Sequence, residues 1–412
     1  MPLSTRAQST FTLFAVTLSI GTSLLAGEWF LRSFYHFPDS LAPFTPFRNN
    51  LPGSHFQLVQ KEFDITLEYN RQGFRDSDFE KKLDAPKKLI FLGDSFIQGF
   101  GVEEENRASN LVETELNKNS TGRTVSVFNA GQIMSGPFHY FLNLIRFGIA
   151  LKPDVVVVGL FMGNDFIEAH HRLIPNGYRV REQYPIYSRE LDDKPFWRIS
   201  YLLTLVQSFL DKKNLIQRRI NSNQYWKFFY GKEINRDFFF EMSGMDHKEF
   251  ENHISTIPES TLDDFFSGRI NPSYLTSSFL STKEAAGPSY TGDDIRNVFN
   301  AIYEMYFICS QRKIPFLLVI FPSPYQVFPQ EYSTHLKQNF GYKKVPESLK
   351  ELDNIHQALI EWLRIEAIDS IDLKQILNIE DYYLFDGHLN SKGQFKVADQ
   401  ILNRIRPWVE VN

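Results

Sequence analysis

Short apolar runs alternate with stretches of helical periodicity along most of the chain. Runs typical of strands buried in a parallel sheet occupy residues 88–92, 124–128, 155–161 and 315–321, with a weaker one at 367–373. Apolar residues recur at helical spacing over 110–116, 138–149, 293–311, 348–366 and 391–405. Strands that alternate with helices predict an α/β fold in which helices cover both faces of the sheet.

The N-terminus carries a different pattern. Residues 7–27 contain no charge, and this length suits one bilayer-spanning helix. Leu24-Leu25-Ala26 resembles a cleavage site, but the apolar stretch is longer than a usual signal-peptide core. We therefore expect residues 1–32 to form an uncleaved signal anchor. Arg6 would stay inside, and the rest of the chain would be exported to a periplasmic or extracytoplasmic location.

The remaining segments divide the chain further. Residues 33–60 are irregular and rich in proline, which predicts a stalk, and residues 63–69 alternate as an edge strand does. From 166 to 288 the strand–helix rhythm stops and aromatic residues are frequent. This segment is too long for a loop without structure, so we expect a mostly helical insertion, or lid, over the mouth of the site. The core domain would then comprise residues 61–165 and 289–412.

Charge and composition exclude several classes of function. The net charge is −5 and no basic block appears, which argues against a nucleic-acid partner. Gly99 and Gly101 lack the rest of either nucleotide-binding fingerprint. His170 and His171 are adjacent, so their side chains rarely point the same way, and no carboxylate stands at ligand spacing. We expect neither a cofactor nor a metal.

Candidate hydrogen-bonding groups stand at the ends of three of the expected strands. Ser95, Gly131 and Asn164 each stand just past or at a strand end, where open α/β sheets bind their ligands. A serine hydroxyl needs a neighbouring base and an oxyanion hole to act as a nucleophile. His388 offers the base, and Asp386 could hold it in one tautomer. The pattern predicts Ser95, His388 and Asp386 as catalytic residues.

These residues resemble the four sequence blocks of the SGNH (GDSL-type) hydrolases. The blocks are Phe-Leu-Gly-Asp-Ser-Phe at 91–96, Asn-Ala-Gly at 129–131, Gly-Asn-Asp at 163–165 and Asp-Gly-His-Leu-Asn at 386–390. The resemblance implies a three-layer α/β/α fold with a five-stranded parallel sheet of flavodoxin-like order. It also implies an oxyanion hole made by the N–H groups of Ser95 and Gly131 and by the Asn164 amide.

Two further features refine the resemblance. The commonest final block has aspartate three residues before histidine, where this chain has Phe385, while Asp386 stands two residues before and Leu389 follows. The Asp-x-His form is similar to polysaccharide O-acetyltransferase-like relatives. Upstream, Asn-Arg-Gln-Gly-Phe-Arg at 70–75 resembles a lead-in of many bacterial membrane-anchored members.

Several functions remain open at this stage. Each block alone is an ordinary turn, but four in this order favour a serine ester hydrolase acting on acyl, especially acetyl, esters of envelope carbohydrate or lipid. The alternatives are an O-acyltransferase to a polysaccharide, a lipase-type enzyme, and a non-catalytic envelope protein that retained the fold. The expected partners are the acylated substrate and, through the N-terminal helix, the membrane.

Overall fold

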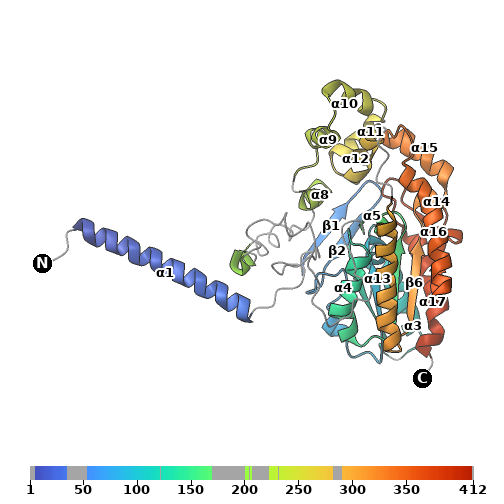
Figure 1. The fold of residues 1–412 in the computed structure, drawn as a ribbon, viewed down its shortest axis with the longest axis horizontal. Helices are drawn as coiled ribbons and strands as arrows, with labels where there is room; N and C mark the ends of the chain where they lie inside the picture. Colours follow the sequence, from blue (N-terminus) through green and yellow to red (C-terminus); the bar gives the residue numbers. More distant parts are fainter. Residues whose placement is uncertain are drawn as a thin grey trace.

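A parallel sheet forms the centre of the protein (Figure 1). The computed structural model describes residues 5–34, 53–120, 122–168, 200–203, 205–206, 222–230, 232–281 and 290–410. Within them the five strands lie in the order β4-β3-β5-β6-β7, and every neighbouring pair is parallel. The strands are β3 (Lys87–Gly93), β4 (Val125–Gly131), β5 (Val155–Phe161), β6 (Phe316–Phe321) and β7 (Ser370–Asp372). This flavodoxin-like order confirms the predicted fold class.

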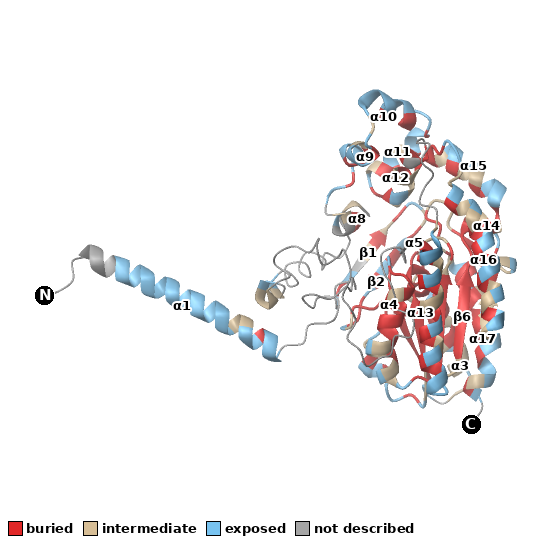
Figure 2. Cartoon of the chain, in the orientation of Figure 1, coloured by how far each residue is buried: buried red, intermediate tan, exposed pale blue. Residues whose placement is uncertain are grey.

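Each face of the sheet carries its own apolar core, because successive strand residues point to opposite faces. In β3, Leu89 and Phe91 belong to one core and Ile90 and Leu92 to the other. The first core includes residues of α3 (Ala108–Asn117) and α17 (Ser391–Glu410). The second includes α4 (Pro137–Asn143), α13 (Gly292–Gln311) and α16 (Glu347–Ile365). Figure 2 shows the buried strands between exposed outer helix faces, so the molecule has the three predicted layers.

Helix α13 illustrates why the helical segments form where they do. Its first turn is a capping box, in which Thr291 Oγ1 accepts from the Asp294 N–H and the Asp294 carboxylate accepts from the Thr291 N–H. Its buried residues then recur at helical spacing, at 298, 301, 302, 305, 308 and 309. That stripe packs on the sheet and leaves the opposite face in solvent.

The N-terminal strands form a separate unit. Strands β1 (His55–Val59) and β2 (Asp64–Glu68) pair antiparallel in a two-stranded sheet. The expected strand at 63–69 therefore exists, but it pairs with β1 and not with an edge of the main sheet, and β1 itself falls within the expected stalk. Buried Ile65 and Leu67 join the first core, so the hairpin packs its apolar face on the domain.

The described part of the expected insertion is helical. After α5 (Asp165–Glu168) it contains the following helices, which stand over the end of the sheet in Figure 1: α8 (Ser222–Tyr230), α9 (Arg236–Ser243), α10 (His247–Ile254), α11 (Glu259–Phe266) and α12 (Pro272–Leu280). Phe239, Phe265 and Phe279 are fully buried in the first core, so these helices share one core with the domain. Residues 169–199, which include His170 and His171, and residues 207–221 and 282–289 lie outside the described residues.

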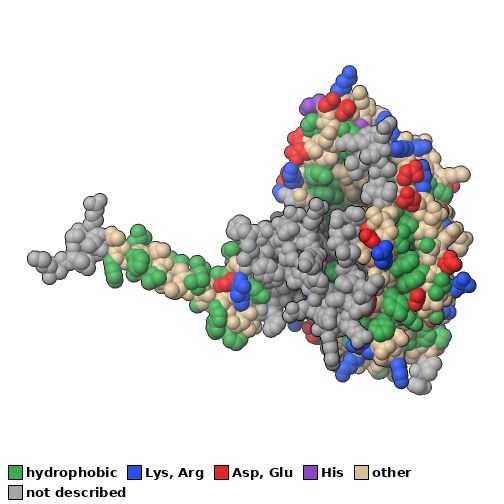
Figure 3. Space-filling view, in the orientation of Figure 1, with side chains coloured by type: hydrophobic (Ala, Val, Ile, Leu, Met, Phe, Trp, Pro, Cys, Tyr) green, Lys and Arg blue, Asp and Glu red, His purple; other side chains and the backbone are tan. Residues whose placement is uncertain are grey.

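The first helix, α1 (Thr5–Phe34), is long and apolar. Residues 10–34 have a mean hydropathy of 1.5 in an 18-residue window, enough to cross a membrane or to serve as a signal sequence. Figure 3 shows hydrophobic side chains along α1, with charged ones gathered near its end toward the body of the protein. There the Glu28 carboxylate accepts from Ser200 Oγ at 2.7 Å and from the Tyr201 and Leu202 N–H groups, both at 2.9 Å.

Candidate active site

Ser95 stands on a tight turn between β3 and the short helix α2 (Ser95–Gln98). Asp94 caps this helix, and its Oδ1 accepts from the Phe96 N–H at 2.9 Å. A Cβ on Gly93 would lie 2.3 Å from the Ile97 side chain, so glycine is needed for α2 to pack this closely on the strand. The turn thus holds the Ser95 side chain at the carboxyl end of the sheet.

The structure brings Ser95, His388 and Asp386 together in one hydrogen-bonded chain. His388 Nε2 lies 2.6 Å from Ser95 Oγ, and His388 Nδ1 lies 2.5 Å from Asp386 Oδ1. Ser95 is 6% exposed and Asp386 7%. His388 and Asp386 belong to the loop of residues 383–388, which we call the His388 loop and which precedes α17. A serine, an imidazole and a carboxylate in this order form the arrangement that activates a hydroxyl.

The electrostatics of His388 suit a proton acceptor. Burial alone would lower its pKa, but the charge and hydrogen bond of Asp386 outweigh burial, and the charge of Asp94 adds to them, so the pKa of His388 is raised above 6.5. With Nδ1 protonated and bonded to Asp386, Nε2 is free to accept the Ser95 proton. A raised pKa makes the ring a stronger base and stabilises the imidazolium that forms.

Aromatic rings surround the imidazole. The rings of Phe96 and Phe100 each lie 5.0 Å from the His388 ring. Phe96 also stacks on Phe161 at 4.0 Å, and Phe100 stacks on Tyr225 of α8 at 6.1 Å. The insertion therefore reaches the residues that pack against His388. These apolar walls lower the local dielectric, which strengthens the hydrogen bonds of the site.

The two expected oxyanion donors besides Ser95 lie at the same edge of the sheet. Gly131 ends β4, but its N–H donates to Asn129 Oδ1 at 2.9 Å. A Cβ on Gly131 would lie 2.3 Å from the Gln98 backbone nitrogen, so this glycine allows β4 to approach α2. Asn164 lies in the turn after β5. The role of both residues in an oxyanion hole stays a prediction. For Gly131 the geometry does not favour this role, because its N–H already donates to Asn129.

Two residues outside the expected set hold the His388 loop. The Glu62 carboxylate, from the β1–β2 turn, accepts backbone N–H bonds at 2.8 to 3.0 Å from Leu384, Phe385 and Asp386. Tyr274 Oη of α12 donates to the Asp386 carbonyl at 2.6 Å. Nothing in the sequence marks either residue, because Glu62 lies more than 300 positions from the loop and Tyr274 more than 100.

The lead-in at 70–75 supports the turn that follows Ser95. Arg75 is fully buried, and its guanidinium donates to the carbonyls of Gly99 at 2.6 Å and Val102 at 2.7 Å. It also donates to the Thr66 carbonyl in β2 at 2.9 Å. Arg75 therefore ties the hairpin to the segment after α2, which gives the lead-in a structural role.

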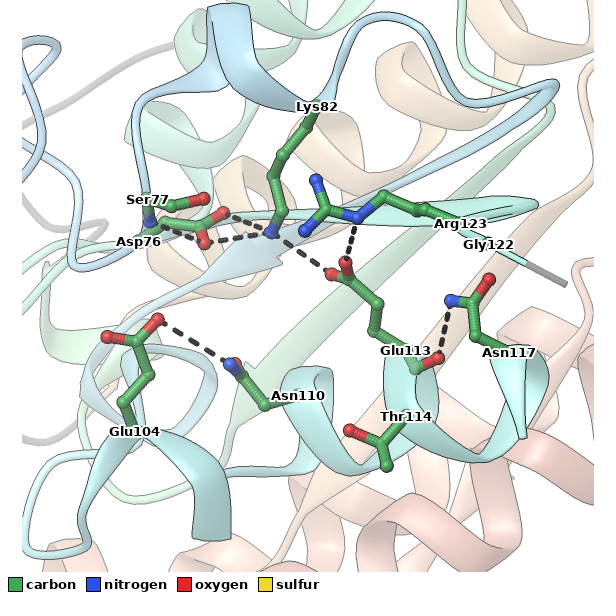
Figure 4. Close-up of a pocket in the computed structure, with 10 residues that line it drawn as sticks. All are labelled: Asp76, Ser77, Lys82, Glu104, Asn110, Glu113, Thr114, Asn117, Gly122 and Arg123. Atoms are coloured by element: carbon green, nitrogen blue, oxygen red, sulfur yellow. Dashed lines mark hydrogen bonds and ion pairs between the residues drawn. The ribbon is translucent and has the colours of Figure 1, made fainter. Parts of the chain in front are cut away.

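A second candidate site is a polar hollow beside β4 (Figure 4). Lys82 Nζ lies 2.9 Å from Asp76 Oδ1 and 3.0 Å from Glu113 Oε2, and Arg123 pairs with Glu113. Asp76 also accepts the Asn129 N–H at 2.8 Å. These charges pair with one another across the hollow, and Asp76 also binds the β4 backbone. We therefore interpret the hollow as a structural support for β4. Among the described residues, no group of three or more His, Cys, Asp or Glu side chains could hold a metal ion.

Comparisons with known proteins find similarity in structure only. No family model matches the chain, and no curated protein matches its sequence. A lipase/acylhydrolase from Enterococcus faecalis is similar at 12% identity and a TM-score of 0.36, over 78% of this chain and 96% of that one. A GDSL-like lipase from Bacteroides thetaiotaomicron is similar at 9% and 0.35, over 78% and 89%. An acetyl xylan esterase is similar at 15% and 0.33, over 77% and 99%.

Sequence identities and TM-scores this low do not allow the activity of those proteins to be inferred for this chain. The chain's own architecture is more specific, since its sheet order is the one that the four sequence blocks imply. The first block also runs from the end of β3 into the turn that carries Ser95, and the last block carries His388, which meets Ser95. By sheet order and block placement, the chain has the three-layer fold with a five-stranded parallel sheet that its resemblance to the SGNH (GDSL-type) hydrolases implies.

Proposed function

We propose that this chain is a serine ester hydrolase that works through an acyl-enzyme on Ser95. The observation that carries the proposal is the hydrogen-bonded chain from Ser95 Oγ through His388 to Asp386, at 2.6 and 2.5 Å. Its position at the carboxyl ends of parallel strands supports the proposal, because substrates of open α/β sheets bind there.

The geometry suggests how the reaction would proceed. Ser95 Oγ attacks the ester carbonyl carbon while its proton passes to His388 Nε2, and Asp386 stabilises the imidazolium. The tetrahedral intermediate collapses, the C–O bond to the alcohol breaks, and Nε2 returns the proton to the leaving oxygen. A water molecule then gives its proton to Nε2 and attacks the acyl-enzyme. Collapse releases the acid and restores the Ser95 hydroxyl.

The surroundings support a small acyl group, such as acetyl. Phe96 and Phe161 stack 4.0 Å apart, and Phe96 packs on the His388 ring. A Cβ on Gly163 would lie 2.4 Å from the Phe161 ring, so that ring already fills space beside the turn that carries Asn164. The apolar α1 helix supports a location at the cell envelope, where acylated carbohydrate and lipid are candidate substrates.

Transfer of the acyl group to a sugar hydroxyl is the second candidate. The observation that favours it is the covering of the site, since Tyr225 of the insertion packs on Phe100 and Ser95 is only 6% exposed. A covered acyl-enzyme is shielded from bulk water, which favours another acceptor. Acetate release and acetyl transfer to an added glycan should be measured together from an acetyl donor. Transfer that exceeds release would identify an acyltransferase.

Labelling with a fluorophosphonate probe tests the proposal, because the probe reacts only with an activated serine. The wild-type chain should be labelled, and Ser95→Ala should lose the label together with at least about 10³-fold of p-nitrophenyl acetate hydrolysis. Ser348→Ala removes a buried serine of α16 and should be labelled like the wild type. A wild-type chain that resists the probe would favour the non-catalytic alternative.

A further inference from the structure

We propose that Glu62 is a positioning residue for the reaction, because its carboxylate holds the His388 loop in the conformation that aims Asp386 at His388. This inference rests on the proposed function, since positioning has meaning only for a working triad. The hydrogen bonds of Glu62 go to the backbone of the loop and not to Ser95 Oγ or the His388 ring. Glu62 acts through the backbone of the loop that carries Asp386 and His388.

The Glu62 carboxylate accepts three backbone hydrogen bonds from the loop. Oε1 accepts from the Leu384 N–H at 2.9 Å, and Oε2 accepts from the N–H groups of Phe385 at 2.8 Å and Asp386 at 3.0 Å. Three consecutive backbone donors thus converge on one carboxylate. Hydrogen bonds to an ionised acceptor are stronger than neutral ones, so this cradle fixes the backbone just before His388 most firmly when Glu62 is ionised.

The turn that carries Glu62 is itself anchored on both sides. The Lys61 N–H donates to the Arg269 carbonyl of the insertion at 2.8 Å, and Lys61 Nζ pairs with the Asp264 carboxylate. The same Nζ lies 4.5 Å from the Phe385 ring centroid. The turn therefore joins the insertion to the His388 loop, and Glu62 is held where it can reach the loop.

Both backbone polar groups of Asp386 are hydrogen-bonded to other parts of the chain. Its N–H donates to Glu62, while its carbonyl accepts from Tyr274 Oη at 2.6 Å. With both backbone polar groups bonded, the residue cannot rotate about its backbone without breaking one of them. Its side chain then stays aimed at His388 Nδ1. Displacements of about 1 Å in an active site can cost on the order of 10²-fold in rate.

The charges around Glu62 give the proposal a pH-dependent consequence. Burial, with the nearby Asp386 charge, raises the pKa of Glu62 to about 7 despite the three N–H bonds. Facing it are Asp386, the Tyr383 phenol of the same loop and the neighbouring Lys61, which pairs with Asp264. An ionised Glu62 adds negative potential near Asp386 and His388, and so favours the imidazolium.

The first test compares Glu62→Gln, Glu62→Asp and Glu103→Gln. Glutamine offers one acceptor oxygen where three N–H groups converge, so kcat should fall about 10- to 100-fold while KM stays within about threefold. Aspartate keeps the carboxylate and should recover part of the loss. Glu103 is the matched control, since its carboxylate accepts the Thr66 N–H in the same hairpin away from the loop, and Glu103→Gln should retain wild-type kcat.

The pH profile separates positioning from a general loss of structure. Glu62→Gln removes a group that titrates near pH 7 and a negative charge near His388. Both changes move the acid limb of kcat/KM to lower pH. A variant that only loosened the fold would lower the rate without moving the limb. Wild-type kcat in Glu62→Gln, or a lowered kcat with an unmoved limb, overturns the proposal.

Hydrogen exchange on the full-length chain gives a readout independent of activity. The amides of Leu384, Phe385 and Asp386 should exchange at least about tenfold faster in Glu62→Gln than in the wild type. In Glu103→Gln their exchange rates should equal those of the wild type. Unchanged protection in Glu62→Gln contradicts the role of Glu62 itself. If exchange accelerates but the wild-type chain resists the fluorophosphonate probe, the proposed function fails and the positioning role falls with it.

Discussion

At the scale of single residues, the departure from the commonest final block has a structural explanation. Gly387, at a φ of +83°, turns the backbone between Asp386 and His388, so an aspartate two positions before the histidine reaches its Nδ1. Phe385, three positions before, packs instead against the rings of His335 and Phe340. The Asp386 carboxylate thus reaches His388 from two positions before it, while Phe385 packs away from the imidazole.

Replacing Asp386 tests this assignment. In Asp386→Asn, the amide holds the wrong imidazole tautomer and no longer stabilises the imidazolium, so kcat should fall by up to about 10⁴-fold, as in a serine protease with the same change. The residual activity should have its acid limb at lower pH, because the Asp386 charge raises the pKa of His388. A steady-state pH series measures both effects. Asp399→Asn, on the exposed face of α17, should match the wild type, and full activity in Asp386→Asn would contradict the assignment.

At the scale of elements, the His388 loop depends on parts of the chain outside the sheet. It has few backbone bonds of its own, among them the Tyr383 N–H to the His388 carbonyl at 2.8 Å and the Gly387 N–H to the Tyr383 carbonyl at 2.8 Å. The hairpin turn and α12 supply the rest through Glu62 and Tyr274. The insertion therefore supports the loop through Tyr274.

Tyr274→Phe isolates the contribution of α12. The variant leaves the ring in place but removes the hydroxyl that donates to the Asp386 carbonyl. Loss of this hydrogen bond should lower the free energy of unfolding by about 1 kcal/mol. We also expect kcat to fall by severalfold, less than in Glu62→Gln, because one bond is lost and not three. Urea denaturation and steady-state kinetics measure the two effects. Tyr303→Phe, on the exposed face of α13, should change neither, and an unaltered Tyr274→Phe would show that α12 does not support the loop.

At the scale of the whole molecule, α1 stands apart from the body of the protein and exposes apolar side chains (Figure 1). Such a surface is unfavourable in water, so a lipid environment suits it better. The bonds from Glu28 to residues 200–202 join the end of this helix to the insertion. An anchored helix would thus hold this part of the insertion near the membrane.

Membrane fractionation tests the anchor. The full-length chain should remain in the membrane pellet after an alkaline carbonate wash. The measured mass of the intact protein should include the N-terminal helix. Leu18→Arg places a charge in the middle of α1, which costs about 2.5 to 3.5 kcal/mol of insertion free energy, so part of the chain should move to the soluble fraction. Thr10→Arg, near the helix end, should have a smaller effect. A mature protein that lacks the helix would identify it as a cleaved signal sequence.

Much of the fold and the centre of the site could be predicted from local sequence. Parallel strands are buried on both faces, so each is a continuous apolar run such as that of β5, and the helices between them have their own period. Strand ends meet at one edge of such a sheet, which predicts the place of Ser95, whereas His388 could be paired with it only through the resemblance of residues 386–390 to the final block.

Contacts across the fold were decided only by the tertiary structure. The pairing of β2 with β1, the bond of the Gly131 N–H to Asn129, and the grip of Glu62 and Tyr274 on the His388 loop have no local pattern. Periodicity and turn chemistry report on residues within a few positions of one another. A hydrogen bond between residues 322 positions apart depends on how whole layers pack, so no window of sequence contains it.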